Sequence, residues 1–266
     1  MPVKKFTSAD SGKIIYQDEG KGDPVVLLHG FAEDHTIWER QVDYLKEKFR
    51  LIMPDIPGSG GSPFNEKLST MDDYARVIRS ILDHESIVSC QLIGHSMGGY
   101  ITLAFAEKNP EMLESFGLFH STAYADNEEK KNARKKGIEF IRQYGSAKFI
   151  EQTIPNLFSD KFKAESADVI KELLRRFANF NPASLVRYYE GMMERPDRTH
   201  VLKKFKKPVL FIMGEYDTAI PLQQSLEQCH LPDFSYIHIA KNSGHMAMLE
   251  ESNWSNHVLE KFLGNV

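Results

Sequence analysis

The sequence predicts an α/β fold in which a mostly parallel sheet is covered by helices. Short apolar runs alternate along the chain with longer segments of helical periodicity. Several of these runs are apolar throughout, as expected for parallel strands that are buried on both faces. A Gly-x-Ser-x-Gly pentapeptide stands between one such run and the helical segment after it.

The composition fits this fold and excludes several classes of function. The chain has 266 residues, 41% of them hydrophobic, and a formal net charge of −4. It has no basic stripe, so we expect no nucleic-acid partner. No run of about 20 apolar residues and no ordinary signal peptide is present, so we expect no membrane partner and a cytoplasmic location. Cys90 and Cys229 form no disulfide framework.

The N-terminal part of the chain predicts four strands. Residues 3–8 and 13–17 have strand composition, and the turn-forming residues 10–12 lie between them, which predicts an antiparallel pair. Residues 25–29 and 51–54 are short apolar runs. We expect both to be buried strands of the parallel part of the sheet.

Two helices are predicted around these strands. Asp34 is expected to cap a helix over residues 35–48, where apolar residues recur at helical spacing. A second helix is expected over residues 69–84. Its start has the Ser-x-x-Asp pattern of a capping box, formed by Ser69 and Asp72.

The regular alternation continues to about residue 121 and then stops. Apolar strands are predicted over 87–93 and 116–120, with a helix over 100–108 between them. From about 122 to 195 we find no convincing buried strand. Helical patterns follow one another there, over residues 127–144, 147–154, 164–177 and 182–193. Alternation resumes at Pro208, with strands expected over 208–213 and 235–240.

The pentapeptide from Gly94 to Gly98 places Ser96 between a strand and a helix. A serine there needs a strained backbone, because a sharp turn must push its hydroxyl out of the loop. Glycines two residues before and two after keep such a turn free of side-chain collisions. The following helix directs its positive N-terminal end at the serine. The pattern indicates a nucleophile elbow.

An acid and a histidine follow further strands in an informative order. Asp217 comes after the strand expected over 208–213, and His245 comes after the strand expected over 235–240. The order Ser96, Asp217, His245 differs from the orders of the chymotrypsin and subtilisin triads.

These features together resemble the α/β-hydrolase superfamily, over nearly the whole chain from Pro24 to about Phe262. The resemblance rests on four segments, namely His29-Gly30-Phe31, the Asp-x-Pro-Gly-x-Gly-x-Ser loop from Asp55 to Ser62, the pentapeptide, and Gly214–Asp217 with Gly244-His245. It implies a mostly parallel eight-stranded sheet and an inserted all-helical cap. The core would comprise residues 1–121 and 196–266, and the cap residues 122–195.

The resemblance also implies the roles of the three residues. Serine is a poor nucleophile unless a base takes its proton, and His245 is the expected base. Asp217 is expected to orient the imidazole. Asp126 is the alternative acid, because some family members place the acid after the sixth strand. Glu215 lies near Asp217, but its spacing from the strand does not suit the role.

An oxyanion formed on a carbonyl needs donors already aimed at it. The backbone N–H of Met97, directly after the serine, is the first expected donor. The second, carried over from the His-Gly motif, is the N–H of Phe31, whose side chain would also wall the pocket. We interpret His29 as a residue that braces its loop, and His95 and His120 as packing residues.

The expected activity is hydrolysis of small to medium carboxylic esters through an acyl-enzyme on Ser96, with no cofactor and no metal. Alternatives on the same triad are carbon–carbon bond hydrolysis, thioester or lactone hydrolysis, and cofactor-free haloperoxidase or perhydrolase activity. A small-molecule receptor derived from a hydrolase is the non-enzymatic alternative. Some apolar side chains of the expected cap should line the pocket, from among Phe140, Tyr144, Phe149, Phe158, Phe177, Phe180, Tyr188, Tyr189, Met192 and Met193.

Overall fold

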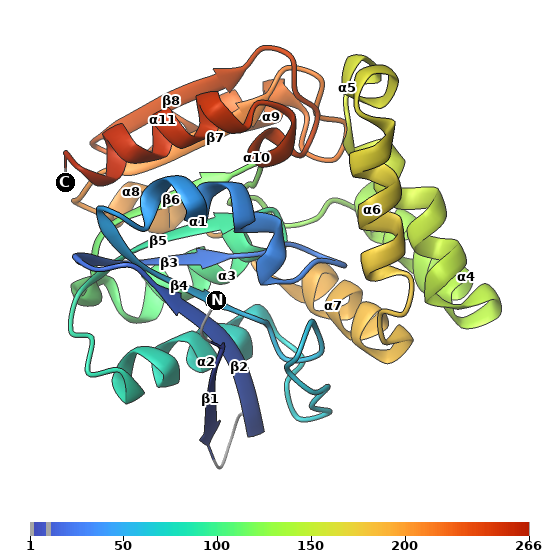
Figure 1. The fold of residues 1–266 in the computed structure, drawn as a ribbon, viewed down its shortest axis with the longest axis horizontal. Helices are drawn as coiled ribbons and strands as arrows, with labels where there is room; N and C mark the ends of the chain where they lie inside the picture. The colour runs from blue at the N-terminus through green and yellow to red at the C-terminus, as the bar shows by residue number, and fades with distance from the viewer. Residues whose placement is uncertain (1–2, 9–11, 266) are drawn as a thin grey trace.

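The computed structural model describes residues 3–8 and 12–265 and confirms the predicted α/β architecture (Figure 1). Eight strands form one sheet in the order β1-β2-β4-β3-β5-β6-β7-β8. The β1–β2 and β2–β4 pairs are antiparallel, and every other pair is parallel. The strands are β1 (Val3–Ser8), β2 (Gly12–Glu19), β3 (Asp23–Leu28), β4 (Phe49–Pro54), β5 (Cys90–His95), β6 (Leu113–Phe119), β7 (Val209–Gly214) and β8 (Ser235–Ala240).

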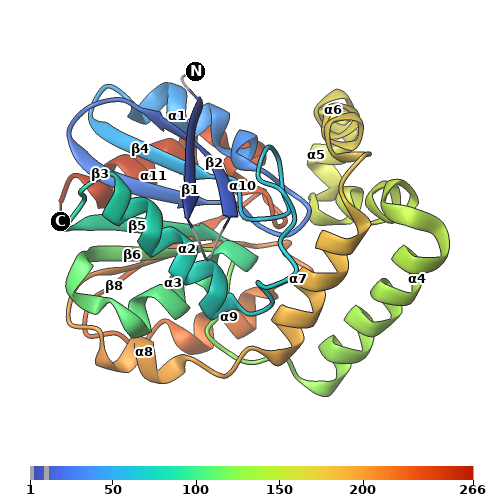
Figure 2. The same ribbon diagram turned by 90° about the horizontal axis from the view of Figure 1, so that it is seen from below.

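Helices cover both faces of the sheet. Helices α1, α10 and α11 contact one another on one face, whereas α2, α3 and α8 group on the other (Figures 1 and 2). None of the helices in the described part of the chain is long and apolar enough to cross a membrane. The helices are η1 (His35–Trp38), α1 (Glu39–Leu45), α2 (Met71–His84), α3 (Met97–Lys108), η2 (Pro110–Met112), α4 (Glu128–Thr153), η3 (Ile154–Leu157), α5 (Asp160–Glu165), α6 (Ala167–Phe177), α7 (Pro182–Glu194), α8 (Thr199–Lys204), α9 (Leu222–Gln228), α10 (Ala247–Glu250) and α11 (Ser252–Leu263).

Helices α4 to α7 lie between β6 and β7 in the chain, and we call residues 122–195 the helical insertion. Figure 2 shows these helices grouped together beside the sheet rather than on either of its faces. Over 122–195, all of it described, no strand is present, as predicted. The predicted break in the first long helical segment is also present, because Gly145 adopts φ 82° and interrupts α4.

The first two predicted helices differ in detail from the prediction. The helix expected over 35–48 begins as the 3₁₀ turn η1, capped as expected by Asp34, and ends at Leu45. Helix α2 is capped by Thr70 rather than by Ser69. The Thr70 hydroxyl accepts the Asp73 N–H while the Asp73 carboxylate accepts the Thr70 N–H, so the capping box lies one residue later than expected. Of the turn predicted at 10–12, residues 10 and 11 lie outside the described residues.

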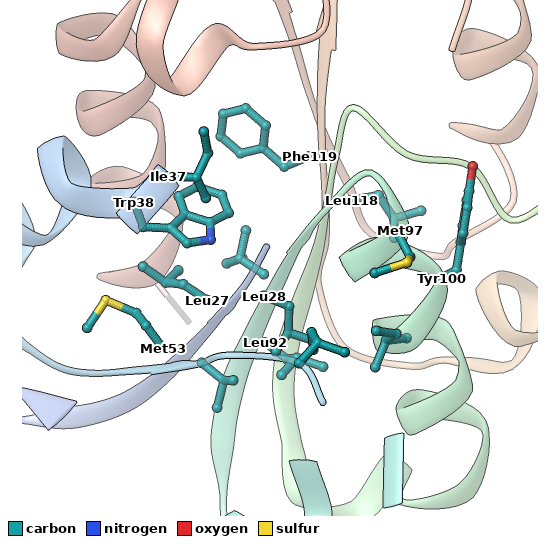
Figure 3. Packing of buried hydrophobic residues seen from close by; sticks show 14 of the residues in the cluster. Leu27, Leu28, Ile37, Trp38, Met53, Leu92, Met97, Tyr100, Leu118 and Phe119 are labelled. Carbon is teal, nitrogen blue, oxygen red and sulfur yellow. The ribbon is translucent and has the colours of Figure 1, made fainter. Parts of the chain in front are cut away.

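The core is formed where the central strands meet the covering helices. Leu27 and Leu28 of β3 and Leu92 of β5 are wholly buried there (Figure 3). The Trp38 ring packs edge-on against Phe119 of β6, with ring centroids 5.4 Å apart. Burying each such side chain stabilises the fold by about 1.5–3 kcal/mol. The central strands are therefore firmly held.

Candidate active site

The sheet order brings the sequence-predicted site residues to one edge. Strand β3 pairs with β5, so the loop that begins at His29 lies beside Ser96. Strand β7 pairs with β8, with Gly214 opposite Ala240, so the loops that carry Asp217 and His245 also start side by side. All of these loops follow the carboxyl ends of parallel strands, where ligands bind in open α/β sheets.

Ser96 has the strained backbone that the pentapeptide predicts. Its φ is 51° and its ψ −114°, and α3 starts at the next residue. A Cβ on Gly94 would lie 2.3 Å from the Gly98 carbonyl oxygen, and one on Gly98 would lie 2.7 Å from the Leu28 and His29 carbonyl oxygens. Only glycine therefore fits at these two positions. Ser96 is the one residue from 91 to 100 that is not buried.

His245 and Asp217 form a buried hydrogen-bonded pair. Nδ1 of His245 lies 2.7 Å from Oδ2 of Asp217. The other carboxylate oxygen accepts the N–H groups of Ala219 and Ile220, at 2.9 and 2.8 Å. Burial would raise the pKa of Asp217, but the charge of His245 and the hydrogen bonds from His120 and His245 outweigh it and hold this pKa well below its usual range. The aspartate is ionised and can orient the imidazole.

The alternative acid, Asp126, has different partners. Its carboxylate accepts from Nε of Arg134 at 2.6 Å and pairs with Arg195 at 2.9 Å. Burial would raise the pKa of Asp126, but these two guanidinium groups lower it. Glu215 is exposed at the surface and pairs with Lys241 at 3.5 Å. The geometry therefore supports Asp217 as the acid.

His120 belongs to the same hydrogen-bond network, which the interpretation as a packing residue missed. Its Nδ1 lies 3.0 Å from Oδ2 of Asp217, and its Nε2 accepts the Ala247 N–H at 3.3 Å. Burial lowers the pKa of His120 to about 4, although Asp217 acts in the opposite direction. The ring is therefore neutral and carries its proton on Nδ1, which it donates to Asp217. The sequence signal that could have revealed this role of His120 was its position, as a polar residue directly after β6.

The same three side chains bring possible metal-ligand atoms together. One atom each of His120, Asp217 and His245 lies within 4.8 Å of the others. A histidine ligates a metal through a deprotonated nitrogen. Nδ1 of His120 carries the proton that Asp217 accepts, so this nitrogen has no free lone pair for a metal. The cluster is better suited to holding protons than to holding an ion.

The titration of His120 predicts how its contribution to stability changes with pH. An unfolded histidine titrates near pH 6.5, and folded His120 near pH 4, so the unfolded chain binds one more proton between these values. The destabilisation caused by His120→Gln should be largest above pH 6.5. It should shrink by about 1.4 kcal/mol per pH unit as the pH falls toward 4. Urea unfolding at pH 7, 6 and 5 measures this.

The control for this prediction is His257→Gln, which changes an exposed histidine of α11 that hydrogen-bonds the Asn253 carbonyl. Its effect on the free energy of unfolding should not show the same decline with pH. A penalty for His120→Gln that stays constant from pH 7 to 5 would contradict a neutral, buried His120.

His95 is also more than a packing residue. Its Nδ1 lies 2.9 Å from Oε2 of Glu33, and its Nε2 lies 3.0 Å from the His245 carbonyl oxygen. Both partners are acceptors, so both ring nitrogens donate and the ring is an imidazolium. Burial would lower the pKa of His95, but the Glu33 carboxylate raises it, and the same Glu33 oxygen accepts the Gly30 N–H at 2.6 Å. This ion pair ties together the loop after β3, the elbow and the His245 loop.

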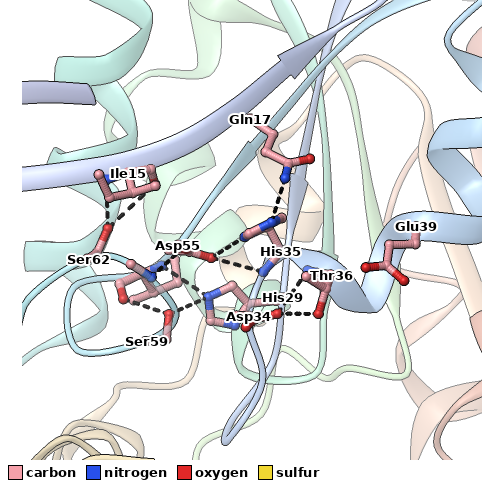
Figure 4. A network of polar contacts seen from close by, with 12 residues as sticks. Ile15, Gln17, His29, Asp34, His35, Thr36, Glu39, Asp55, Ser59 and Ser62 are labelled. Atoms are coloured by element: carbon pink, nitrogen blue, oxygen red, sulfur yellow. Dashed lines mark hydrogen bonds and ion pairs between the residues drawn. The ribbon is translucent and has the colours of Figure 1, made fainter. Parts of the chain in front are cut away.

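His29 braces its loop, as the sequence predicted (Figure 4). Its Nδ1 lies 2.8 Å from the Gly30 carbonyl oxygen, and its Nε2 accepts the Ile56 N–H at 3.0 Å. The loop that begins at Asp55 is held in turn. The Asp55 carboxylate accepts from the backbone and ring of His35 at 3.0 and 2.6 Å and from the Gly61 N–H at 2.8 Å.

The helical insertion contacts the backbone of the His245 loop directly. The His245 N–H donates to the Leu157 carbonyl at 2.7 Å. The Ser159 N–H of the insertion donates to Oε2 of Glu250 at 2.8 Å, and Oε1 of Glu250 accepts the N–H groups of Gly244 and Met246. The position of His245 therefore depends on the insertion as well as on β8.

Two small cavities meet above Ser96. The first, of about 260 Å³, is lined by Ser96 and His245 and also by Tyr100, Lys130 and Arg134. The second, of about 270 Å³, is mainly apolar and is bounded by helix α6 and the η3 turn. The two share part of their walls, which is formed by Phe31, Glu33, Leu157, Tyr189 and Ala219. A ligand near Ser96 therefore meets one compartment that carries cationic side chains and one that is mainly apolar.

Known proteins resemble this chain over most or all of its length. A structure of a thermophilic esterase from Thermogutta terrifontis, with malate bound, is 29% identical with a TM-score of 0.93, covering 100% of this chain and 99% of that one. The 2-hydroxy-6-oxononadienedioate/2-hydroxy-6-oxononatrienedioate hydrolase of Escherichia coli (strain K12) is 28% identical over 94% of this chain and 91% of its own length. The uncharacterized hydrolase YugF of Bacillus subtilis (strain 168) is 27% identical over 84% and 83%.

The family model described as alpha/beta hydrolase fold matches residues 23–252. This range includes β3 to β8, the pentapeptide and the residues that surround the cavities. The chain therefore belongs to the α/β-hydrolase fold family and is an α/β-hydrolase enzyme.

Proposed function

We propose that this enzyme is a serine hydrolase that cleaves carboxylic esters of small to medium size through an acyl-enzyme on Ser96. The observation that carries this proposal is the 2.7 Å contact between His245 and Asp217, on a histidine that lines the same cavity as Ser96. The 29% identity to an esterase over the full chain supports the choice of ester.

In the first half of the reaction, the Ser96 Oγ attacks the ester carbonyl carbon while His245 Nε2 takes the hydroxyl proton. Asp217 keeps the other imidazole proton on Nδ1 and stabilises the imidazolium. The tetrahedral intermediate collapses, the alcohol leaves with the proton from His245, and the acyl group stays on Ser96. Water then repeats these steps and releases the acid.

The negative charge of the intermediate needs two donors, for which we propose the backbone N–H groups of Phe31 and Met97. Met97 is the first residue of α3, so its N–H has no acceptor within the helix. Gly30 supports the placement of the first donor. A Cβ on Gly30 would lie 3.1 Å from Cβ of Ser96, so this loop passes directly beside the nucleophile.

The helical insertion is proposed to be the substrate cap. Core residues 1–121 and 196–266 supply Ser96, Asp217 and His245, whereas residues 122–195 supply Leu157, Tyr189 and Met192 to the cavity wall. The chemical step would belong to the core, and selection of the substrate would be shared with the cap.

Side chains of the cap should set the length of ester that fits. Tyr189→Ala and Met192→Ala remove bulk from the cavity that Ser96 lines, so longer esters should be accepted and short ones bound more weakly. One lost contact of this kind changes discrimination by roughly 1–3 kcal/mol. The measurement is kcat/KM over p-nitrophenyl esters from acetate to octanoate.

The matched control is Phe140→Ala, which packs on Tyr144 of the same insertion and lines neither cavity. It should keep the parent profile, and all three variants should still react with a small fluorophosphonate at Ser96. If Tyr189→Ala and Met192→Ala also keep the parent profile, the insertion does not set selectivity.

Turnover separates the proposed enzyme from a receptor that keeps the triad. With p-nitrophenyl acetate and butyrate, rapid release of many equivalents of p-nitrophenol supports the proposal. A single slow burst with a large rise in thermal stability favours a receptor.

A further inference from the structure

We propose that the preferred substrate is an ester that also carries a carboxylate, which Lys130 and Arg134 hold beside Ser96. This inference rests on the proposed function and narrows it. Both cations come from helix α4, and both line the cavity that contains Ser96 and His245. Cationic side chains in a small, partly enclosed site attract an anionic group there far more strongly than the same charges do in open solvent.

Arg134 is the better-fixed of the two cations. Its guanidinium is held by the Asp126 carboxylate, with an Nε–Oδ2 distance of 2.6 Å, and lies 5.4 Å from the centre of the Tyr189 ring. Asp126 cannot fully neutralise the charge of Arg134, because the same carboxylate also pairs with Arg195 at 2.9 Å. One carboxylate is therefore shared by two guanidinium groups behind the cavity wall, and Lys130 adds a further cation to the wall itself.

Lys130 differs from Arg134 in that its partner is a neutral side chain. Its Nζ donates to the side-chain oxygen of Gln224 on α9 at 3.1 Å, and no carboxylate of the described residues lies within ion-pair distance of it. The ammonium group is held in place by the neutral side-chain amide of Gln224. It can therefore accept a ligand carboxylate without first giving up another anion.

The one carboxylate that lines the cavity does not compensate these charges. Glu33 is already paired with the His95 imidazolium at 2.9 Å and accepts the Gly30 N–H at 2.6 Å. The adjoining cavity adds an apolar compartment, lined by Ile154, Leu173 and Phe177 among others. The two compartments together suit an ester with one apolar side and one anionic side.

The carboxylate could belong to the acyl or to the alcohol part of the ester, and two matched pairs of probes separate these cases. The first pair is mono-p-nitrophenyl glutarate and p-nitrophenyl valerate. The second is γ-acetoxybutyrate and butyl acetate. In at least one pair, the enzyme should show a kcat/KM about 10-fold or more higher for the anionic member at low salt, and the preference should fall as salt is added.

Lys130→Glu should abolish or reverse this preference, and Lys130→Gln should reduce it several-fold. The control is Lys135→Gln, which changes an exposed lysine of the same helix that lines no part of the cavity and should keep the preference. Equal or poorer use of the anionic member in both pairs would overturn the inference. So would a preference that survives Lys130→Glu.

A binding measurement keeps this test separate from the proposed function. Calorimetry with glutarate on the intact protein and on Lys130→Glu reads anion binding without any turnover. If no ester is cleaved but glutarate binds in a Lys130-dependent way, ester hydrolysis is wrong and the anion site stands. If neutral esters are cleaved and glutarate does not bind, ester hydrolysis stands and the anion site is wrong.

Discussion

Ser96→Ala is expected to abolish ester hydrolysis, with a loss of about 10³-fold or more in kcat, because members of a triad act as a unit. The alanine removes the only hydroxyl that the elbow presents to the cavity. The loss is measured by steady-state hydrolysis of p-nitrophenyl butyrate. Rates are compared per folded protein, which circular dichroism and the unfolding midpoint establish.

The fold should survive this change. The hydrogen bonds that hold Ser96 in place run through its backbone, since its N–H donates to the Phe119 carbonyl and its carbonyl accepts from Gly99 and Ser121. A fluorophosphonate should label the parent protein at Ser96 and leave the variant unlabelled. Labelling of a different serine, or activity that persists in the alanine variant, would refute the assignment of the nucleophile.

Asp217→Asn should lower kcat by roughly 10³–10⁴-fold, because the imidazole loses the anion that orients it and stabilises its charged form. In this protein the substitution should also disturb the hydrogen bond from His120. The aspartate accepts from both His120 and His245 through one oxygen, and an amide can accept from both only if its oxygen faces them. The measurement is kcat for a neutral ester across pH 6 to 9.

The comparison for this prediction is Asp126→Asn. This variant leaves Arg134 and Arg195 without their shared carboxylate, and breaking a buried ion pair of this kind costs about 3–5 kcal/mol of stability. Its kcat for a neutral ester, per folded molecule, should change little. If Asp126→Asn loses activity and Asp217→Asn keeps it, the acid is the residue after β6.

The main features of the site could be predicted from the sequence because they follow from local patterns. The elbow is a continuous motif, and the strand that precedes each functional loop is a short apolar run. Loops that follow parallel strands meet at one edge of the sheet, so the positions of Ser96, Asp217 and His245 after such strands predict that they lie at the same edge. The strained φ of Ser96 follows from the same local pattern.

The supporting contacts could not be predicted, because they join residues far apart in the chain. Glu33 pairs with His95 across 62 positions, and His120 reaches Asp217 across 97. Neither pair has a spacing that reveals it, since each depends on which strands are neighbours and how far each loop extends. The cationic wall has the same origin. Lys130 and Arg134 look like solvated positions of an amphipathic helix until α4 is placed over Ser96.

The bond from His245 to the Leu157 carbonyl bears on how substrates enter and leave. If the insertion swung away as a rigid lid, it would release the backbone of His245, the proposed general base, and the Glu250 contacts that hold its loop. Opening and catalysis would then exclude each other, and each cycle would require slow domain motion on the μs–ms timescale. We therefore expect passage through local gates, formed by rotation of side chains such as Tyr189 at the junction of the two cavities. Such rotations are fast, so the turnover rate of this enzyme would be set by the chemical steps rather than by access.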